Sequence, residues 1–232
     1  HLKRDMTVHA YPVYGSADIR LIIGGTGKVR SAMAAAFLLS GRPDTGQDIL
    51  CNIGFCGAGG ETAKPGALIA VWKVTDMDTR RDYYPDVFWG QDLAGAALCC
   101  FARPVRRTDI AAPDSASFYC DMESAGIMVA AGRFLDAHQV VLLKIVSDLL
   151  APDQLDQAAL QQLLAGRLPE IDRIIGSLRN QAGGANRDFL AGERDLLDRL
   201  RDNHHFTVAM MHLLDEEVRK AFLNGKNPAA IL

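Results

Sequence analysis

Apolar residues in the first 150 positions come in short blocks that alternate with glycine-rich or polar breaks. Two blocks joined by a turn, residues 8–14 and 19–23, predict a β-hairpin. The alanine-rich block from Lys28 to Ser40 has the spacing of a largely buried helix. Gly41 and Pro43 follow it as stop signals.

The later blocks predict strands that alternate with buried helices. Strands are expected at residues 48–54, 66–74, 98–102 and 140–146, and a helix from about Ile127 to Phe134. Residues 76–92 are polar and aromatic and predict a long surface loop. This order predicts an α/β fold, a three-layer αβα arrangement around a central mixed, largely parallel twisted sheet.

The pattern changes near residue 153, where leucine and isoleucine recur at helical spacing. We therefore expect two regions, an α/β domain over 1–152 and a helical extension over 153–232. The extension carries no obvious chemistry, and we expect it to pack on the same domain or on a partner.

Composition narrows the partners. The chain has 232 residues, of which 49% are hydrophobic, and its formal net charge of −3 gives no reason to expect nucleic acid or an anionic membrane surface. Its longest apolar runs are too short to span a bilayer, and no secretory pattern opens the chain. We expect a cytoplasmic protein.

The five cysteines have no spacing typical of disulfides or zinc. Their number is odd, Cys99 and Cys100 are adjacent, and no C-x-x-C occurs. Small core residues are the better interpretation, and no metal is expected.

Two glycine-rich segments follow strands. Gly24–Gly27 lacks the third glycine of a dinucleotide fingerprint, where Arg30 stands, and it also fails the phosphate-loop pattern. A simple turn is favoured there, although its free N–H groups could hold an anion. The second segment, Gly54–Gly60, has four glycines in seven residues, which slightly favours a loop that approaches a ligand.

Three acids stand next to buried elements: Asp121, Glu123 and Asp148. Taken singly, Glu123 is best explained by the helix dipole and Asp148 by a cap. Because ligands of parallel α/β sheets bind beyond the carboxyl ends of strands, the acids together favour one site. We expect Glu123 and Asp148 to face one pocket.

Other polar and aromatic groups have two interpretations each. Arg103, Arg106 and Arg107 would meet a phosphate or form a solvated loop, and the solvated loop is favoured. His204-His205 is best explained as a solvated cap. Four aromatic residues would stack on a base or pack at a subunit contact: Tyr83, Tyr84, Phe88 and Trp89.

The order of the motifs resembles the nucleoside phosphorylase and nucleosidase superfamily, most of all the methylthioadenosine/S-adenosylhomocysteine nucleosidases. Four segments between about residues 10 and 150 carry the resemblance. They are Gly24–Val29, similar to S-G-I-G-K-V, Asn52–Gly57, similar to N-T-G-S-A-G, Asp121-Met122-Glu123, similar to E-M-E, and Val146-Ser147-Asp148, similar to I-S-D.

The resemblance implies a phosphorylase/hydrolase-like fold and a mechanism without cofactors. Asp148 would protonate the leaving purine, and Glu123 would hold the ribose hydroxyls and stabilise an oxocarbenium-like transition state. A purine nucleoside would be the small-molecule partner, and the chain would form a homodimer or a higher oligomer. The implied substrate-binding residues are Met122, Asp121, Ser147, Phe55, Cys56, Gly57 and Gly25.

The departures from the family refine this expectation. Purine phosphorylases carry an arginine and a hydroxyl for phosphate where this chain has Ile53 and Phe55, which favours water as the nucleophile. Asp121 replaces a glutamate. The sequence begins at His1, and we expect the family's first strand and its water-activating glutamate to lie outside it.

We therefore expect a purine nucleoside N-glycosidase that hydrolyses nucleosides like methylthioadenosine or adenosylhomocysteine. The alternatives are a purine nucleoside phosphorylase, a non-catalytic nucleoside-binding protein, and a structural protein that kept only the fold.

Overall fold

The structure, a computed structural model, describes residues 2–40, 48–60, 63–85, 93–110, 118–154 and 156–180. The chain divides into two compact units, His1–Leu178 and Arg179–Leu232, and the first of them is described below. The predicted helices after residue 180 and the interpretations of His204, His205, Phe88 and Trp89 lie outside the described residues.

A small antiparallel sheet opens the chain. It consists of β1 (Lys3–Arg4), β2 (Val13–Gly15) and β3 (Arg20–Ile22), in that order. Tyr14 of β2 lies opposite Leu21 of β3, so the predicted hairpin is confirmed. The ring of Tyr11 packs on Phe37 of the following helix, with ring centroids 5.2 Å apart.

Two helices cover one face of the main sheet. They are α1 (Lys28–Leu39), which confirms the predicted helix, and α2 (Ser124–Ala131). Alanines dominate the side of α1 that packs inward, and α2 is buried almost throughout. Both helices share one core cluster with the sheet, so the small side chains permit close approach of helix and sheet.

The main sheet has six strands in the order β6-β5-β7-β8-β4-β9. Their bounds are β4 Leu50–Gly59, β5 Leu68–Asp76, β6 Arg81–Tyr83, β7 Ala94–Cys100, β8 Phe118–Asp121 and β9 Val140–Asp148. The two longest ladders, β4–β9 and β5–β7, are parallel, whereas β4–β8 and β5–β6 are antiparallel. The prediction of a mixed α/β fold is confirmed.

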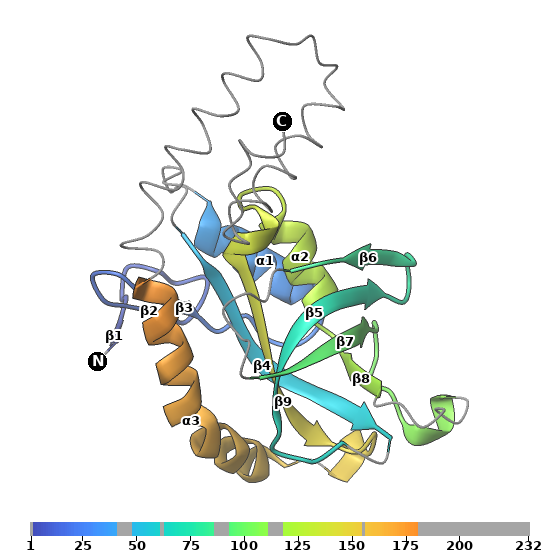
Figure 1. Ribbon diagram of the computed structural model, residues 1–232. Coiled ribbons are helices and arrows are strands. Elements are labelled where there is room, and N and C mark those ends of the chain that lie inside the picture. Colours follow the sequence, from blue (N-terminus) through green and yellow to red (C-terminus); the bar gives the residue numbers. More distant parts are fainter. Residues whose placement is uncertain are drawn as a thin grey trace, which may run out of the picture. The chain divides into compact units, whose positions relative to one another are not determined.

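The other face of the sheet carries α3 (Gln157–Asn180). Its buried residues Ile171, Ile174 and Leu178 pack against side chains of β5 and β9, among them Leu143 and Ile145. Figure 1 shows α3 on one side of the sheet, with α1 and α2 on the other. In the part of the chain that the structure describes, no helix is long and apolar enough to cross a membrane.

Two predicted loops are wrong. The segment Gly54–Gly60 is not a loop, because β4 continues to Gly59. Its glycines make room for neighbouring side chains: a β-carbon on Gly59 would lie 3.0 Å from Leu150 Cδ1. The segment 76–92 contains a strand, β6, which pairs with the end of β5.

Candidate active site

Asp121 ends β8 and is a buried charge. Its side chain is fully buried, and Oδ2 forms an ion pair with Lys144 Nζ at 2.8 Å. The same oxygen accepts hydrogen bonds from the backbone N–H of Ser124, at 3.0 Å, and from its hydroxyl. Asp121 therefore fixes the turn that leads from β8 into α2.

Lys144 is the partner that the sequence did not reveal. It lies in the middle of β9 and is 1% exposed, within the apolar run from Val140 to Val146. Burial disfavours its charged form, but the charge and the hydrogen bond of Asp121 and the charge of Glu123 outweigh that effect, so the pKa of Lys144 lies above its ordinary value. The sequence signal for this buried ion pair is a single lysine inside an apolar run.

Glu123 is the residue before the first turn of α2, where its side chain makes no capping hydrogen bond, and it is only partly buried. Its Oε1 accepts a hydrogen bond from the backbone N–H of Gly27 at 2.8 Å, and its Oε2 lies 3.4 Å from the N–H of Met122. Burial and the charge of Asp121 raise the pKa of Glu123, while the N–H of Gly27 and the charge of Lys144 oppose that rise. The carboxylate thus has a fixed orientation.

The first glycine segment is anchored next to Glu123. Gly27 has a φ of 100°, a left-handed conformation that favours glycine. Lys28 follows it and bonds Asp76 Oδ1 at 2.6 Å and also Asp78, and the hydroxyl of Ser31 donates to the backbone carbonyl of Glu123 at 3.1 Å. The start of α1 is therefore tied both to β5 and to the candidate site.

Asp148 ends β9 and is held by its own turn. Its Oδ2 accepts a hydrogen bond from Ser147 Oγ at 2.7 Å, and its Oδ1 accepts one from the backbone N–H of Ala151 at 2.7 Å. Ser147 Oγ also lies 3.1 Å from the carbonyl oxygen of Cys56 in β4. Both carboxylate oxygens of Asp148 therefore accept hydrogen bonds from neighbouring residues, as those of a capping residue do. The residue nevertheless stays partly exposed.

Strand β4 lies between the two acidic groups. Gly57 is the register partner of Cys120 on β8 and of Asp148 on β9, so the two strand ends meet at its level from opposite directions. A β-carbon on Gly57 would lie in ordinary contact with both strands, 3.4 Å from Cys120 Sγ and 3.6 Å from Asp148 Oδ1. That Glu123 and Asp148 serve one ligand stays a prediction.

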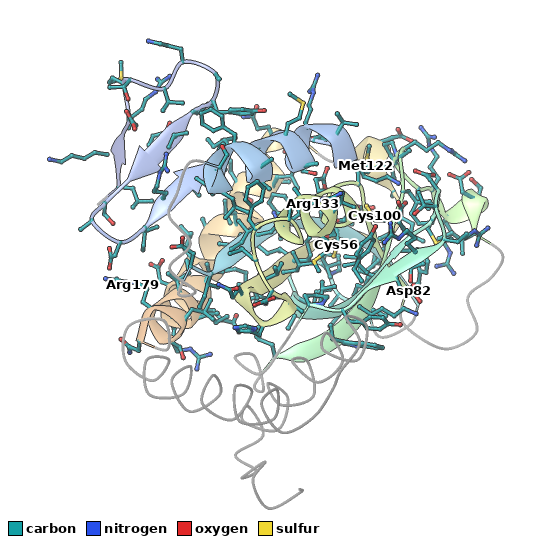
Figure 2. The ribbon with its side chains drawn as sticks, turned by 90° about the horizontal axis from the view of Figure 1, so that it is seen from above. Cys56, Asp82, Cys100, Met122, Arg133 and Arg179 are labelled. Atoms are coloured by element: carbon teal, nitrogen blue, oxygen red, sulfur yellow. The ribbon has the colours of Figure 1, made fainter. Side chains whose placement is uncertain are left out.

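The remaining predicted binding residues lie in different surroundings. Met122 is at the β8–α2 junction and Cys56 is in β4 (Figure 2). Cys56 is buried near Asp121, Lys144 and Asp148. Gly25 has a positive φ of 77° in the first glycine segment. Phe55 packs with the core on the side of α3.

The alternative chemical groups have ordinary partners. Arg106 forms a bidentate contact with Asp153, with distances of 2.8 and 3.0 Å, as expected of a solvated loop. The five cysteines are free thiols, and burial raises the pKa of Cys51 and Cys120 to about 12. Among the described residues, no three His, Cys, Asp or Glu side chains are grouped as a metal site would need.

Comparison with known proteins links this geometry to solved structures. No protein-family model and no curated protein sequence matches the chain. The 5′-methylthioadenosine/S-adenosylhomocysteine nucleosidase of Neisseria meningitidis, in complex with methylthio-immucillin-A, superposes with a TM-score of 0.57 at 15% identity, covering 78% of this chain and 90% of that one.

Two further structures agree. The S-adenosylhomocysteine nucleosidase of Streptococcus pyogenes, in complex with 5-methylthiotubericidin, gives a TM-score of 0.57 at 16% identity over 78% of this chain and 87% of that one. The nucleosidase of Colwellia psychrerythraea 34H, in complex with adenine, gives 0.53 at 20% identity over 76% and 86%. The predicted resemblance is confirmed at the level of the fold.

Proposed function

We propose that the chain is a purine nucleoside N-glycosidase that splits nucleosides like methylthioadenosine or adenosylhomocysteine into base and sugar with water. The observation that carries the proposal is the oriented, partly buried carboxylate of Glu123, held by the N–H of Gly27 at 2.8 Å. The likeness in fold to nucleosidases supports it.

The charge of the Glu123 cluster suits this chemistry. Cleavage of an N-glycosidic bond develops positive charge on the sugar, and a fixed negative group stabilises it best where water is excluded. Asp121 and Glu123 carry two negative charges against one positive charge on Lys144. The cluster therefore has one net negative charge, and Glu123 would direct it at the ribose.

Asp148 would supply the proton for the leaving base. Its hydrogen bond from Ser147 Oγ stabilises the carboxylate that remains after proton transfer. Positioned general acids contribute roughly 10²–10⁴-fold to a rate. Met122, Cys56, Gly57, Phe55 and Gly25 complete the proposed binding residues, with Asp121 and Ser147 supporting the two acids.

Water, rather than phosphate, is the proposed nucleophile. Ile53 and Phe55 both pack in the core cluster under α3, where neither offers a phosphate ligand. The proposal also includes a homodimer or higher oligomer, a cytoplasmic location, a three-layer α/β domain over 1–152 and a helical extension over 153–232.

Base release tests the function. The full chain is incubated with methylthioadenosine, adenosine or inosine, with and without phosphate, and free base and sugar phosphate are measured by chromatography. Release of base without phosphate supports hydrolysis. Release only with phosphate would favour a phosphorylase, and calorimetric binding without release would favour a binding protein.

A matched pair of variants separates the proposed acid from a general loss of charge. Asp148→Asn should lower base release about 10²–10⁴-fold. Asp153→Asn removes an exposed aspartate whose partner is Arg106, and it should leave base release unchanged. Equal activity of the two variants would remove Asp148 from the mechanism.

A further inference from the structure

We propose that Lys144 is a positioning residue, a buried counter-ion that holds the turn from Asp121 to Ser124 and favours the ionised form of Glu123. The inference rests on the proposed function, in which Glu123 must be an anion. Lys144 does not need to touch a substrate for this role.

The first observation is the contact network. Lys144 Nζ bonds Asp121 Oδ2 at 2.8 Å, with both side chains buried, and that oxygen also accepts the backbone N–H of Ser124. Glu123 stands between Asp121 and Ser124 in sequence. The position of its backbone is therefore set by an oxygen that Lys144 neutralises.

The second observation is the space reserved for the ammonium group. Gly54 is the register partner of Lys144, and a β-carbon there would lie 3.2 Å from Nζ. Asn52 Oδ1 would lie 4.0 Å from that same β-carbon. Among the described residues, Asn52 Oδ1 and Asp121 Oδ1 are buried acceptors without a hydrogen-bond partner. The ammonium group thus lies where a side chain at position 54 would crowd it, and Asp121 Oδ2 is the acceptor that it contacts.

Each element packed around Glu123 contributes a charge or a neutral group. From β9 comes Lys144, and from its own segment Asp121. On α1, Lys28 is engaged by Asp76 and Asp78. Burial raises the pKa of two thiols close to Asp121, Cys56 on β4 and Cys100 on β7, so both are neutral near pH 7. Asp148 on β9 lies near Cys56. Lys144 is therefore the cation placed to hold Glu123 ionised.

The test compares two substitutions that should shift the pKa of Glu123 in opposite directions. An opposite charge nearby favours the ionised form of a carboxyl group, and a like charge disfavours it. Removing the cation in Lys144→Met should therefore raise the pKa of Glu123, and removing the anion in Asp121→Asn should lower it. A role limited to packing would not give shifts of opposite direction.

The measurement is a carboxyl titration by ¹³C NMR on the full chain with labelled glutamate. Glu123→Gln identifies the Glu123 signal. Lys73→Met serves as the matched control, because Lys73 pairs with Asp82 at 2.9 Å near the surface, and it should leave the titration unchanged. Lys144→Arg keeps the charge and should restore the wild-type titration.

A second comparison covers the case in which Lys144→Met fails to fold. The double variant Asp121→Asn/Lys144→Met leaves no unpaired buried charge between these two sites. Relative to Asp121→Asn alone, the double variant should raise the pKa of Glu123. Identical titrations of Glu123 in these two variants would overturn the counter-ion role.

Turnover separates this inference from the proposed function. If the wild-type chain releases no base while the titrations shift as stated, the proposed function fails and the counter-ion role stands. If the wild-type chain is active and the titrations coincide, the counter-ion role fails and the proposed function stands. In an active chain, the acid limb of kcat/KM should move to higher pH from Asp121→Asn to the double variant.

Discussion

Gly126 allows the start of α1 to approach α2, and replacing it should disturb both stability and the candidate site. A β-carbon at Gly126 would lie 2.1 Å from the carbonyl oxygen of Lys28 and 2.8 Å from its carbonyl carbon. Ordinary contact begins at 3.4 Å, so Gly126→Ala must separate the two segments by roughly 1 Å. The obstacle is backbone, which no rotamer change can move aside.

The expected cost follows from overpacking. Inserting a methyl group into a packed site costs about 1–3 kcal/mol or more, and alanine returns about 1 kcal/mol of helix propensity. Because the clash is with backbone, we expect the upper end of this range, a net loss of about 2 kcal/mol and a Tm lower by roughly 4–8 °C. The shift would also displace the N–H of Gly27 from Glu123, and a 1 Å misplacement lowers a rate by about 10²-fold.

Thermal unfolding followed by circular dichroism and release of adenine from methylthioadenosine are the two assays. Gly166→Ala is the matched control, because a β-carbon there meets nothing within 4 Å on helix α3. The control should raise stability by up to about 1 kcal/mol and leave base release unchanged. Wild-type stability and base release in Gly126→Ala would refute the close approach of the two helices.

Two further predictions concern charge. Lys28→Met removes the cation that, against burial, lowers the pKa of Asp76, and it should cost about 1–3 kcal/mol at pH 7, measured by urea unfolding. In the wild type, the lowered pKa of Asp76 stabilises the fold above pH 3.8, and this contribution is lost as the pH falls below 3.8. The variant has less of this contribution to lose, so its stability should fall less than that of the wild type over the same pH range. Base release should decline on the acid side at a pH above 4.5, the ordinary value for Glu123, because its pKa is raised and protonation removes the required charge. Glu123→Gln should lack this acid limb, and a wild-type limb at or below 4.5 would contradict the raised pKa.

Local patterns predicted the regular elements well. The hairpin around Tyr14 and Leu21 and the helix from Lys28 follow from alternation, glycine breaks and helical spacing, which are properties of neighbouring residues. The likeness to nucleosidase folds followed from four short motifs in order.

Properties that depend on distant neighbours were missed. The glycines of β4 signalled a loop, yet two of them, Gly54 and Gly59, lie where the side chains of Lys144 and Leu150 occupy the space beside the strand. Composition alone does not distinguish a glycine that bends the chain from one that admits a neighbour.

The sequence identified the acidic residues of the candidate site but not the ion pair that one of them forms. Asp121 was expected to contact a substrate, and the structure gives it a buried ion pair with Lys144. That pairing joins β8 and β9 across β4, so no spacing in the sequence marks it. The terminal helical pattern beyond residue 180 lies outside the described residues.

The most direct test of the account compares two leaving groups in Asp148→Asn. Methylthioadenosine needs a proton on its departing base, whereas 4-nitrophenyl riboside releases 4-nitrophenolate, which leaves as a stable anion without a proton. We expect Asp148→Asn to lose about 10²–10⁴-fold in kcat/KM on methylthioadenosine but to keep most of its rate on the nitrophenyl substrate. Glu123→Gln should be impaired on both, because both reactions develop positive charge on the sugar. Equal loss on both substrates in Asp148→Asn, or no loss on either, would contradict Asp148 as the acid.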